Sequence, residues 1–175
     1  MVTSLPTIVN DIVQQGTKFG SALKYYESQG LATLKGELFF EKNDLRIDFI
    51  PVDDTQTVTI FVITKHNKKV IYAPCDVKPF PNHPSFENAD VLIIGNTVIG
   101  DTLKGGFTLT EDNPFRQELF TMDEIIALKE KYHIPQVVMT HIEEDWGKSY
   151  DDYKELEKLY DGISFAYDGM ELTIL

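Results

Sequence analysis

The spacing of apolar residues predicts helices at the start of the chain and strands after them. Over residues 6–30 the apolar side chains recur every three or four positions, which is the helical period. Gly16 and Gly30 are typical helix ends. Over residues 31–52 the pattern alternates instead, on both sides of the polar turn Lys42-Asn43-Asp44. This alternation predicts a β-hairpin.

Two further apolar runs extend this hairpin. Residues 58–64 and 70–73 are separated by the polar turn at 65–68. The simplest connection is a meander of four antiparallel strands. Residues 91–94 are apolar throughout, as expected of a strand that is covered on both faces.

The second half of the chain alternates helices with strands. Thr121 and Glu124 have the spacing of a capping box, which predicts that a helix begins there. We expect a strand at 136–140 and a second helix at 149–160. A terminal hairpin, 163–175, is predicted to turn at Asp168-Gly169.

This order of elements predicts an α/β fold in which helices cover a sheet. The chain has 175 residues, of which 42% are hydrophobic, so we expect one domain over residues 1–175. The strand at 136–140 is apolar on both faces, which implies a second layer that few remaining strands can supply. We therefore expect an incomplete fold whose exposed sheet face another copy could cover in a homodimer.

Charge and cysteine content narrow the possible partners. Sixteen basic residues against twenty-eight acidic ones give a net charge of −12, which argues against nucleic-acid and membrane partners and favours a small-molecule substrate. An anionic substrate would need a local counter-charge, such as a metal ion. The single cysteine, Cys75, excludes an intrachain disulfide, and no apolar run reaches about 18 residues, so we expect a cytoplasmic protein.

Two residues at predicted strand ends are candidates for chemistry. Asp76 follows the strand at 70–73, and His141 follows the strand at 136–140. Both residue types bind metal ions, although Asp76 also suits a turn and His141 also suits a structural hydrogen bond. Neither H-x-H, H-E-x-x-H nor G-x-S-x-G occurs in the chain, so no self-contained zinc or serine-nucleophile motif is present.

Three stretches together resemble the metallo-β-lactamase superfamily. They are residues 72–76 (Tyr-Ala-Pro-Cys-Asp), 138–142 (Val-Met-Thr-His-Ile) and 165–172 (Phe-Ala-Tyr-Asp-Gly-Met-Glu-Leu). The branch that this chain resembles most contains the cyclic-phosphate phosphodiesterase of phosphonate breakdown. The resemblance implies the C-terminal half of an αββα sandwich, because the H-x-H-x-D-H motif of the family is absent from this chain.

The resemblance also implies roles for particular residues. Asp76 stands where the family places a carboxylate that bridges two metals, and His141 where it places the last histidine ligand. Asp54 stands where a third histidine ligand is usual and would be a further metal ligand or a turn residue. Leu119 replaces a histidine that some relatives carry. The implied cofactor is a divalent metal, zinc or else manganese or iron, with a bound hydroxide that attacks phosphorus or a carbonyl.

These observations lead to three hypotheses about function. The first is a metal-dependent hydrolase, of the phosphodiesterase type by its branch of the family, that is inactive in this truncated form. The second is a non-catalytic half-fold that acts as a binding or protein-interaction module, and it is favoured by the replacements at Asp54 and Leu119. The third is an unrelated α/β domain whose resemblance to the family is due to chance.

Overall fold

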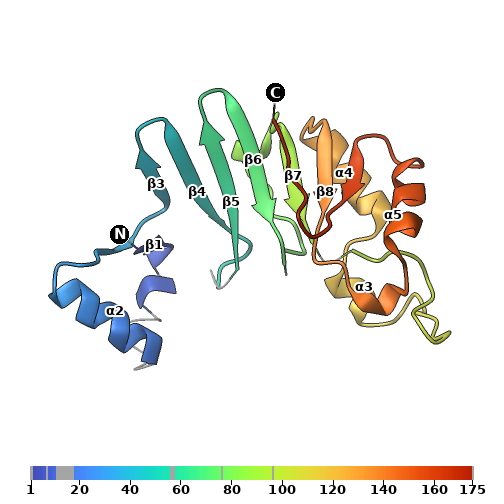
Figure 1. Ribbon diagram of the computed structural model, residues 1–175, viewed down its shortest axis with the longest axis horizontal. Helices are drawn as coiled ribbons and strands as arrows, with labels where there is room; N and C mark the ends of the chain where they lie inside the picture. Colours follow the sequence, from blue (N-terminus) through green and yellow to red (C-terminus); the bar gives the residue numbers. More distant parts are fainter. Residues whose placement is uncertain are drawn as a thin grey trace.

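The centre of the molecule is a seven-stranded sheet (Figure 1). The computed structural model describes residues 2–6, 8–10, 18–55, 58–75, 77–95 and 97–174. The strands lie in the sheet in the order in which they occur in the chain. They are β3 (Phe39–Lys42), β4 (Leu45–Pro51), β5 (Thr59–Lys65), β6 (Lys68–Ala73), β7 (Val91–Ile94), β8 (Gln136–Met139) and β9 (Ile163–Phe165).

The direction of the strands changes at β6. Strands β3 to β6 are antiparallel, which confirms the predicted four-stranded meander. Strands β6 to β9 are parallel, because a longer connection returns the chain to the same end of the sheet each time. The carboxyl ends of β4, β6, β7, β8 and β9 therefore meet at one edge of the sheet.

Four helices have described bounds, and a capping box begins two of them. They are α2 (Lys18–Ser28), α3 (Phe115–Glu118), α4 (Met122–Lys131) and α5 (Tyr150–Glu157), and the 3-10 turns are η1 (Pro84–Phe86) and η2 (Glu144–Trp146). The Thr121 hydroxyl accepts from the Glu124 backbone N–H, and the Glu124 carboxylate accepts from the Thr121 N–H, so the predicted capping box is confirmed. Ser149 and Asp152 form a second capping box at α5.

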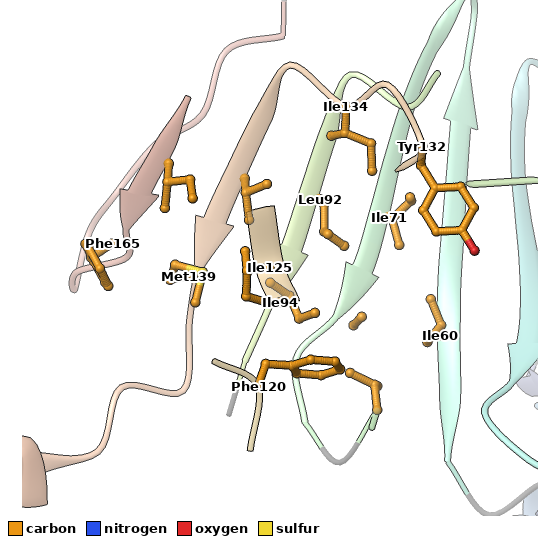
Figure 2. Close-up of a cluster of buried hydrophobic side chains, with 14 of the residues drawn as sticks. Ile60, Ile71, Leu92, Ile94, Phe120, Ile125, Tyr132, Ile134, Met139 and Phe165 are labelled. Atoms are coloured by element: carbon orange, nitrogen blue, oxygen red, sulfur yellow. The ribbon is translucent and has the colours of Figure 1, made fainter. Parts of the chain in front are cut away.

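The hydrophobic core lies between one face of the sheet and the helices. The strand register places Ile71, Leu92 and Val137 side by side on this face, and all three are 0% exposed. Figure 2 shows Ile71 and Leu92 on their neighbouring strands. Helix α4 contributes Ile125, which is 0% exposed, and its C-cap residue Tyr132 is 2% exposed. Each such side chain contributes about 1.5–3 kcal/mol by leaving water, so this layer holds α4 against the sheet.

The opposite face of the sheet is also apolar, but no described helix packs on it. The register places Phe49, Phe61 and Tyr72 in one row across β4, β5 and β6. Phe49 and Phe61 meet edge to face at 5.8 Å, and Tyr72 remains 39% exposed. The described structure is thus a sheet with a single helical layer, in agreement with the expectation of an incomplete α/β fold.

Two of the predicted strands differ from the structure. The run predicted as a single strand from residue 34 is divided, because β2 (Leu34–Gly36) pairs in parallel with β1 (Val2–Ser4) in a separate two-stranded sheet. The predicted terminal hairpin is wrong: after β9 the chain turns, with the Met170 N–H donating to the Tyr167 carbonyl, but residues 170–174 form no strand. No helix in the described ranges has the length and apolar character that a membrane crossing needs.

Candidate functional site

The tips of β6, β7 and β8 approach each other closely around Gly95. This residue follows β7, and a Cβ atom placed on it would lie 1.8 Å from the Pro74 carbonyl oxygen and 2.9 Å from the His141 Cβ. Real Cβ atoms do not approach other atoms so closely, so only glycine fits here. The Gly95 N–H donates to the Ala73 carbonyl at 3.2 Å, and the Thr140 N–H donates to the Ile94 carbonyl at 2.8 Å. These bonds continue the sheet up to the candidate site.

His141 lies directly beyond β8, as the sequence predicts. Its backbone adopts the left-handed conformation with φ +52°, which is uncommon for a residue other than glycine. Its imidazole is partly exposed, and Nε2 lies 3.0 Å from a carboxylate oxygen of Glu143. A neutral imidazole that directs its Nε2–H at this carboxylate presents Nδ1 as its lone-pair nitrogen. The contact therefore orients the ring.

His141 lines a cavity of about 370 Å³ whose wall is mainly apolar. This volume is in the range of small-molecule sites. The apolar wall is formed by Leu103, Leu109, Phe115, Leu119 and Trp146. These residues come from the β7–α4 connection (97–121) and from η2, so the cavity lies between the loops that follow β7 and β8.

The polar part of the lining is acidic. Besides His141, it consists of Cys75, Glu118, Glu143 and Asp145. Position 119, where the family resemblance puts a histidine in some relatives, also faces this cavity, but there it presents the apolar side chain of Leu119. The cavity thus combines one imidazole, one thiol and three carboxylates with a hydrophobic wall.

Lys104 joins the two loops that enclose the cavity. Its backbone N–H donates to the Asp145 carbonyl at 2.7 Å, and its ammonium lies 2.6 Å from the Glu144 carboxylate. The hydrogen bond that Lys104 donates to the Glu144 carboxylate raises the pKa of Lys104 and lowers the pKa of Glu144. Both side chains are largely exposed, so solvent screens the ion pair and the backbone bond is the stronger connection.

Two more cations hold the β7–α4 connection in place. The Arg116 guanidinium donates to the Leu109 carbonyl at 2.8 Å. The Lys78 ammonium donates to the Leu119 carbonyl and to the Glu124 carboxylate, both at 2.8 Å. Partial burial raises the pKa of Glu124, but the hydrogen bonds from Lys78 and from the cap outweigh it, so the pKa lies below its ordinary value of 4.5. Leu109 and Leu119 are therefore anchored through their own backbone.

The structure locates two of the three predicted metal ligands. Asp76 lies outside the described residues, whereas His141 lines the cavity. Asp54 is exposed in the β4–β5 loop, at the same edge of the sheet but outside the cavity lining. Strands β4 and β8 are four strands apart in the sheet. Asp54 therefore approaches this edge from a different strand than His141 does.

The donor atoms around the cavity have the chemistry of a metal site, but the described residues do not complete one. Imidazole, carboxylate and thiolate groups all bind zinc and related ions. Among residues 2–6, 8–10, 18–55, 58–75, 77–95 and 97–174, however, no three His, Cys, Asp or Glu side chains converge on a point that could hold an ion. His141 and the acidic lining therefore offer donor atoms of the kind that bind metals, without forming a complete site among the described residues.

Comparisons with known proteins identify the fold. No protein-family model and no curated protein matches the sequence. Among solved structures, a diphosphatase from the PhnP family superposes with a TM-score of 0.52 at 16% identity, covering 89% of this chain and 55% of that one. Zn(2+)-bound PqqB from Methylobacterium extorquens has a TM-score of 0.57 at 18% identity, covering 98% and 64%. An isothiocyanate hydrolase from Delia radicum gut bacteria has a TM-score of 0.52 at 14% identity, covering 86% and 64%.

These neighbours are metallo-β-lactamase-fold proteins. This chain has part of the metallo-β-lactamase fold. It spans 55% to 64% of the length of the three neighbours, so the expected partial αββα architecture is confirmed. At these identities the likeness concerns the fold and not the activity.

The sequence predicts His141 as a site residue, and the structure places it in the cavity lining, but most other lining residues were not predicted. The apolar wall from the β7–α4 connection has no helical or strand period that would mark it, and Leu103 and Leu109 meet His141 only in three dimensions. One signal was present in the sequence: Gly95 directly follows the apolar run 91–94, where a glycine can mark a close approach of two segments. A second signal was the position of Trp146, the single tryptophan, only five residues after His141 in the chain.

Proposed function

We propose that this chain is part of a metal-dependent hydrolase of the metallo-β-lactamase superfamily. The observation that carries the proposal is the position of His141, which lies at the carboxyl edge of the parallel strands and lines a cavity with three carboxylates. In open α/β sheets, ligands bind at the carboxyl ends of the strands. The metallo-β-lactamase fold of the chain supports the same class of protein.

In this proposal His141 and Asp76 are metal ligands, and Asp54 is a third candidate. The resemblance of the sequence to the family supports these roles, and the contact of His141 with Glu143 supports the first of them, because metal-binding imidazoles usually have a carboxylate or carbonyl partner. The metal, zinc or else manganese or iron, would act as a Lewis acid and would supply a bound hydroxide. The remaining ligands would come from residues that the structure does not describe or that this chain does not contain.

For the reaction we propose hydrolysis of a phosphodiester or a related ester. The branch that the sequence resembles supports this substrate class, and the neighbour from the PhnP family is described as a diphosphatase. Glu143 would hold the His141 ring, and the cavity wall would exclude water from the bound group. Because the described residues lack a complete ligand set, we expect little turnover from this chain alone.

Metal content tests the proposal directly. The whole protein, with any residues beyond this chain, would be purified and its zinc, manganese and iron measured by mass spectrometry. We expect stoichiometric metal in the wild-type protein. His141→Ala and Asp76→Ala should each lower metal content, and each should lower hydrolysis of bis(p-nitrophenyl) phosphate by about 100-fold. The reason is that replacing even a residue behind the ligands usually lowers metal affinity or activity about 10- to 100-fold. His133→Ala is the matched control, because His133 is exposed at the end of α4 and outside the cavity lining.

A specific observation favours a second candidate, a non-catalytic binding module. Leu119 lines the cavity at the position where the family resemblance puts a histidine. Among the described residues, no three His, Cys, Asp or Glu side chains are placed to hold a metal ion together. If the whole protein holds no metal and His141→Ala changes no hydrolysis, the hydrolase proposal fails and the binding module is supported.

A further inference from the structure

The composition of the cavity wall bears on which molecules it can hold. Five of its lining residues are apolar, and two of them are almost completely buried: Leu109 is 3% exposed and Trp146 is 6% exposed. Phe115, at 60% exposed, leaves most of its ring accessible to an entering group. Binding an apolar group against this wall is favourable because it removes apolar surface of both partners from water.

Apart from His141 and Cys75, all the ionisable side chains that line the cavity are carboxylic acids. These are Glu118, Glu143 and Asp145, and no lysine or arginine belongs to the described lining. A carboxylate in the lining repels an anion, although solvent screens part of the repulsion because these side chains are exposed. The net charge of −12 adds to this repulsion at longer range.

The cations close to the cavity are engaged in contacts within the fold. The Lys104 ammonium pairs with Glu144 at 2.6 Å, and Lys78 and Arg116 donate to backbone carbonyls that anchor the wall. Releasing Lys78 or Arg116 to bind an anion would remove these anchors. The described lining therefore presents no lysine or arginine side chain to a phosphate or carboxylate.

From this arrangement we infer that the cavity holds an apolar, uncharged or cationic part of the ligand and discriminates against anionic groups. The inference deepens the proposed function, on which it rests for the reaction. In the proposed hydrolase the cavity takes the hydrophobic substituent of an ester, while the reacting group lies at the His141 end. Substrates with an aromatic or alkyl substituent are accordingly preferred to substrates with a charged sugar or a carboxylate at that position.

The single tryptophan makes a direct binding assay available. Because Trp146 is the only tryptophan of the chain and lines the cavity, its fluorescence reports on this site alone. The probes are 3-phenylpropan-1-ol, 3-phenylpropylamine and 3-phenylpropanoate, which share one apolar body and differ in charge, and n-propanol, which lacks the ring. The assay needs neither metal nor turnover.

We expect the alcohol and the amine to change Trp146 emission saturably. The propanoate should bind at least about tenfold more weakly because of the acidic lining, and n-propanol should have no saturable effect. Phe115→Ala should weaken binding of the alcohol about fivefold, since an aromatic contact is lost. Phe107→Ala is the matched control: Phe107 belongs to the same connection and is 59% exposed, but it does not line the cavity.

Reversing the charge of one lining residue tests whether the acidic side chains cause the weak binding of the anion, because a misfolded variant would not bind the anion more tightly. Glu118→Lys should strengthen binding of the propanoate about tenfold, whereas Glu111→Lys, on the same connection and outside the lining, should leave it unchanged. The inference is overturned if the propanoate binds wild-type protein as tightly as the alcohol, or if Phe115→Ala and Phe107→Ala have equal effects. It is also overturned if none of the phenyl probes changes Trp146 emission saturably.

The outcomes for the cavity and for the proposed function are distinguishable. Saturable, charge-selective binding in a protein that holds no metal would support the cavity inference and refute the hydrolase. Metal-dependent hydrolysis that His141→Ala abolishes, without charge-selective binding at Trp146, would support the hydrolase and refute the cavity inference.

Discussion

An ideal Cβ on Gly95 would lie 2.9 Å from the Cβ of His141. The same atom would lie 1.8 Å from the Pro74 carbonyl oxygen, which belongs to the backbone and cannot move aside as a side chain could. Gly95 therefore sets how closely the tips of β6 and β8 approach each other, and through them the position of the imidazole in the cavity.

Replacing Gly95 tests this relationship. Gly95→Ala should destabilise the fold by about 1–3 kcal/mol, the usual cost of an overpacked site, and should shift the NMR signals of the His141 ring. Urea denaturation measures the stability. Gly105→Ala is the control, because no atom lies within 4 Å of its added Cβ and only its left-handed conformation is disturbed. Equal destabilisation together with an unchanged His141 signal would contradict the role of Gly95.

The carboxyl of Glu124 makes stability depend on pH. Its folded pKa lies below the ordinary value of 4.5, since the hydrogen bonds from Lys78 and Thr121 outweigh the effect of burial. A lowered folded pKa stabilises the native state at pH above 4.5, and this contribution is lost as the pH falls further, through the folded pKa. Glu124→Gln should therefore flatten the acid side of the stability curve.

Urea midpoints measured between neutral pH and about pH 3 check this expectation. Glu130→Gln, an exposed position in the same helix, serves as the control and should leave the acid side unchanged. If the stability of Glu124→Gln falls as steeply with decreasing pH as that of the wild-type protein, other carboxyl groups cause the acid destabilisation.

The hydroxyl of Tyr153 is buried without a hydrogen-bond partner in the described structure. Burial, and then the charge of Asp152, raises the pKa of this phenol. Tyr153→Phe keeps the ring contact with Phe165 at 4.8 Å and removes the unsatisfied group, so it should raise stability at neutral pH by up to about 1 kcal/mol. It should also lessen the loss of stability above the ordinary tyrosine pKa of 10.0, since a raised folded pKa opposes ionisation.

Urea denaturation at neutral and alkaline pH measures both effects of Tyr153→Phe. Tyr167→Phe, at a ring that is 47% exposed, provides the comparison. If Tyr153→Phe lowered stability, the hydroxyl would have a partner that the described residues do not reveal.

The uncovered face of the sheet leads to a prediction about self-association. Tyr72 is 39% exposed beside Phe61 on the face without helices, and we expect two copies to associate through this face. Tyr72→Lys should weaken that association about tenfold or more by placing a charge in the contact. Light scattering over a range of concentrations measures it, and a monodisperse monomer at every concentration would refute it.

The matched control adds the same charge to the other face of the sheet. Thr64 pairs with Arg46 and Lys69 across the strands, on the face opposite Phe61. Thr64→Lys should leave the light scattering of the wild-type protein unchanged. An equal effect of the two substitutions would point to net charge as the cause.

The elements that the sequence predicted correctly are those that depend on residues close together in the chain. The meander from β3 to β6 follows from alternation and from polar turns, and the start of α4 follows from Thr121 and Glu124. The terminal hairpin was wrong, since the alternation at residues 170–174 says nothing about whether a partner strand lies within reach. The cavity could not be predicted because it depends on contacts such as Lys78 with Leu119, which are 41 residues apart.

Each strand of the main sheet pairs with the strand that precedes it in the chain. Pairing between sequence neighbours closes shorter loops than pairing between distant segments, and this lowers the entropic barrier to assembly. During synthesis the ribosome would release β3 to β6 first as a self-contained hairpin series, onto which β7, β8 and β9 could add one at a time. The residues around His141 would then be the last to assemble, after most of the sheet that supports them had formed.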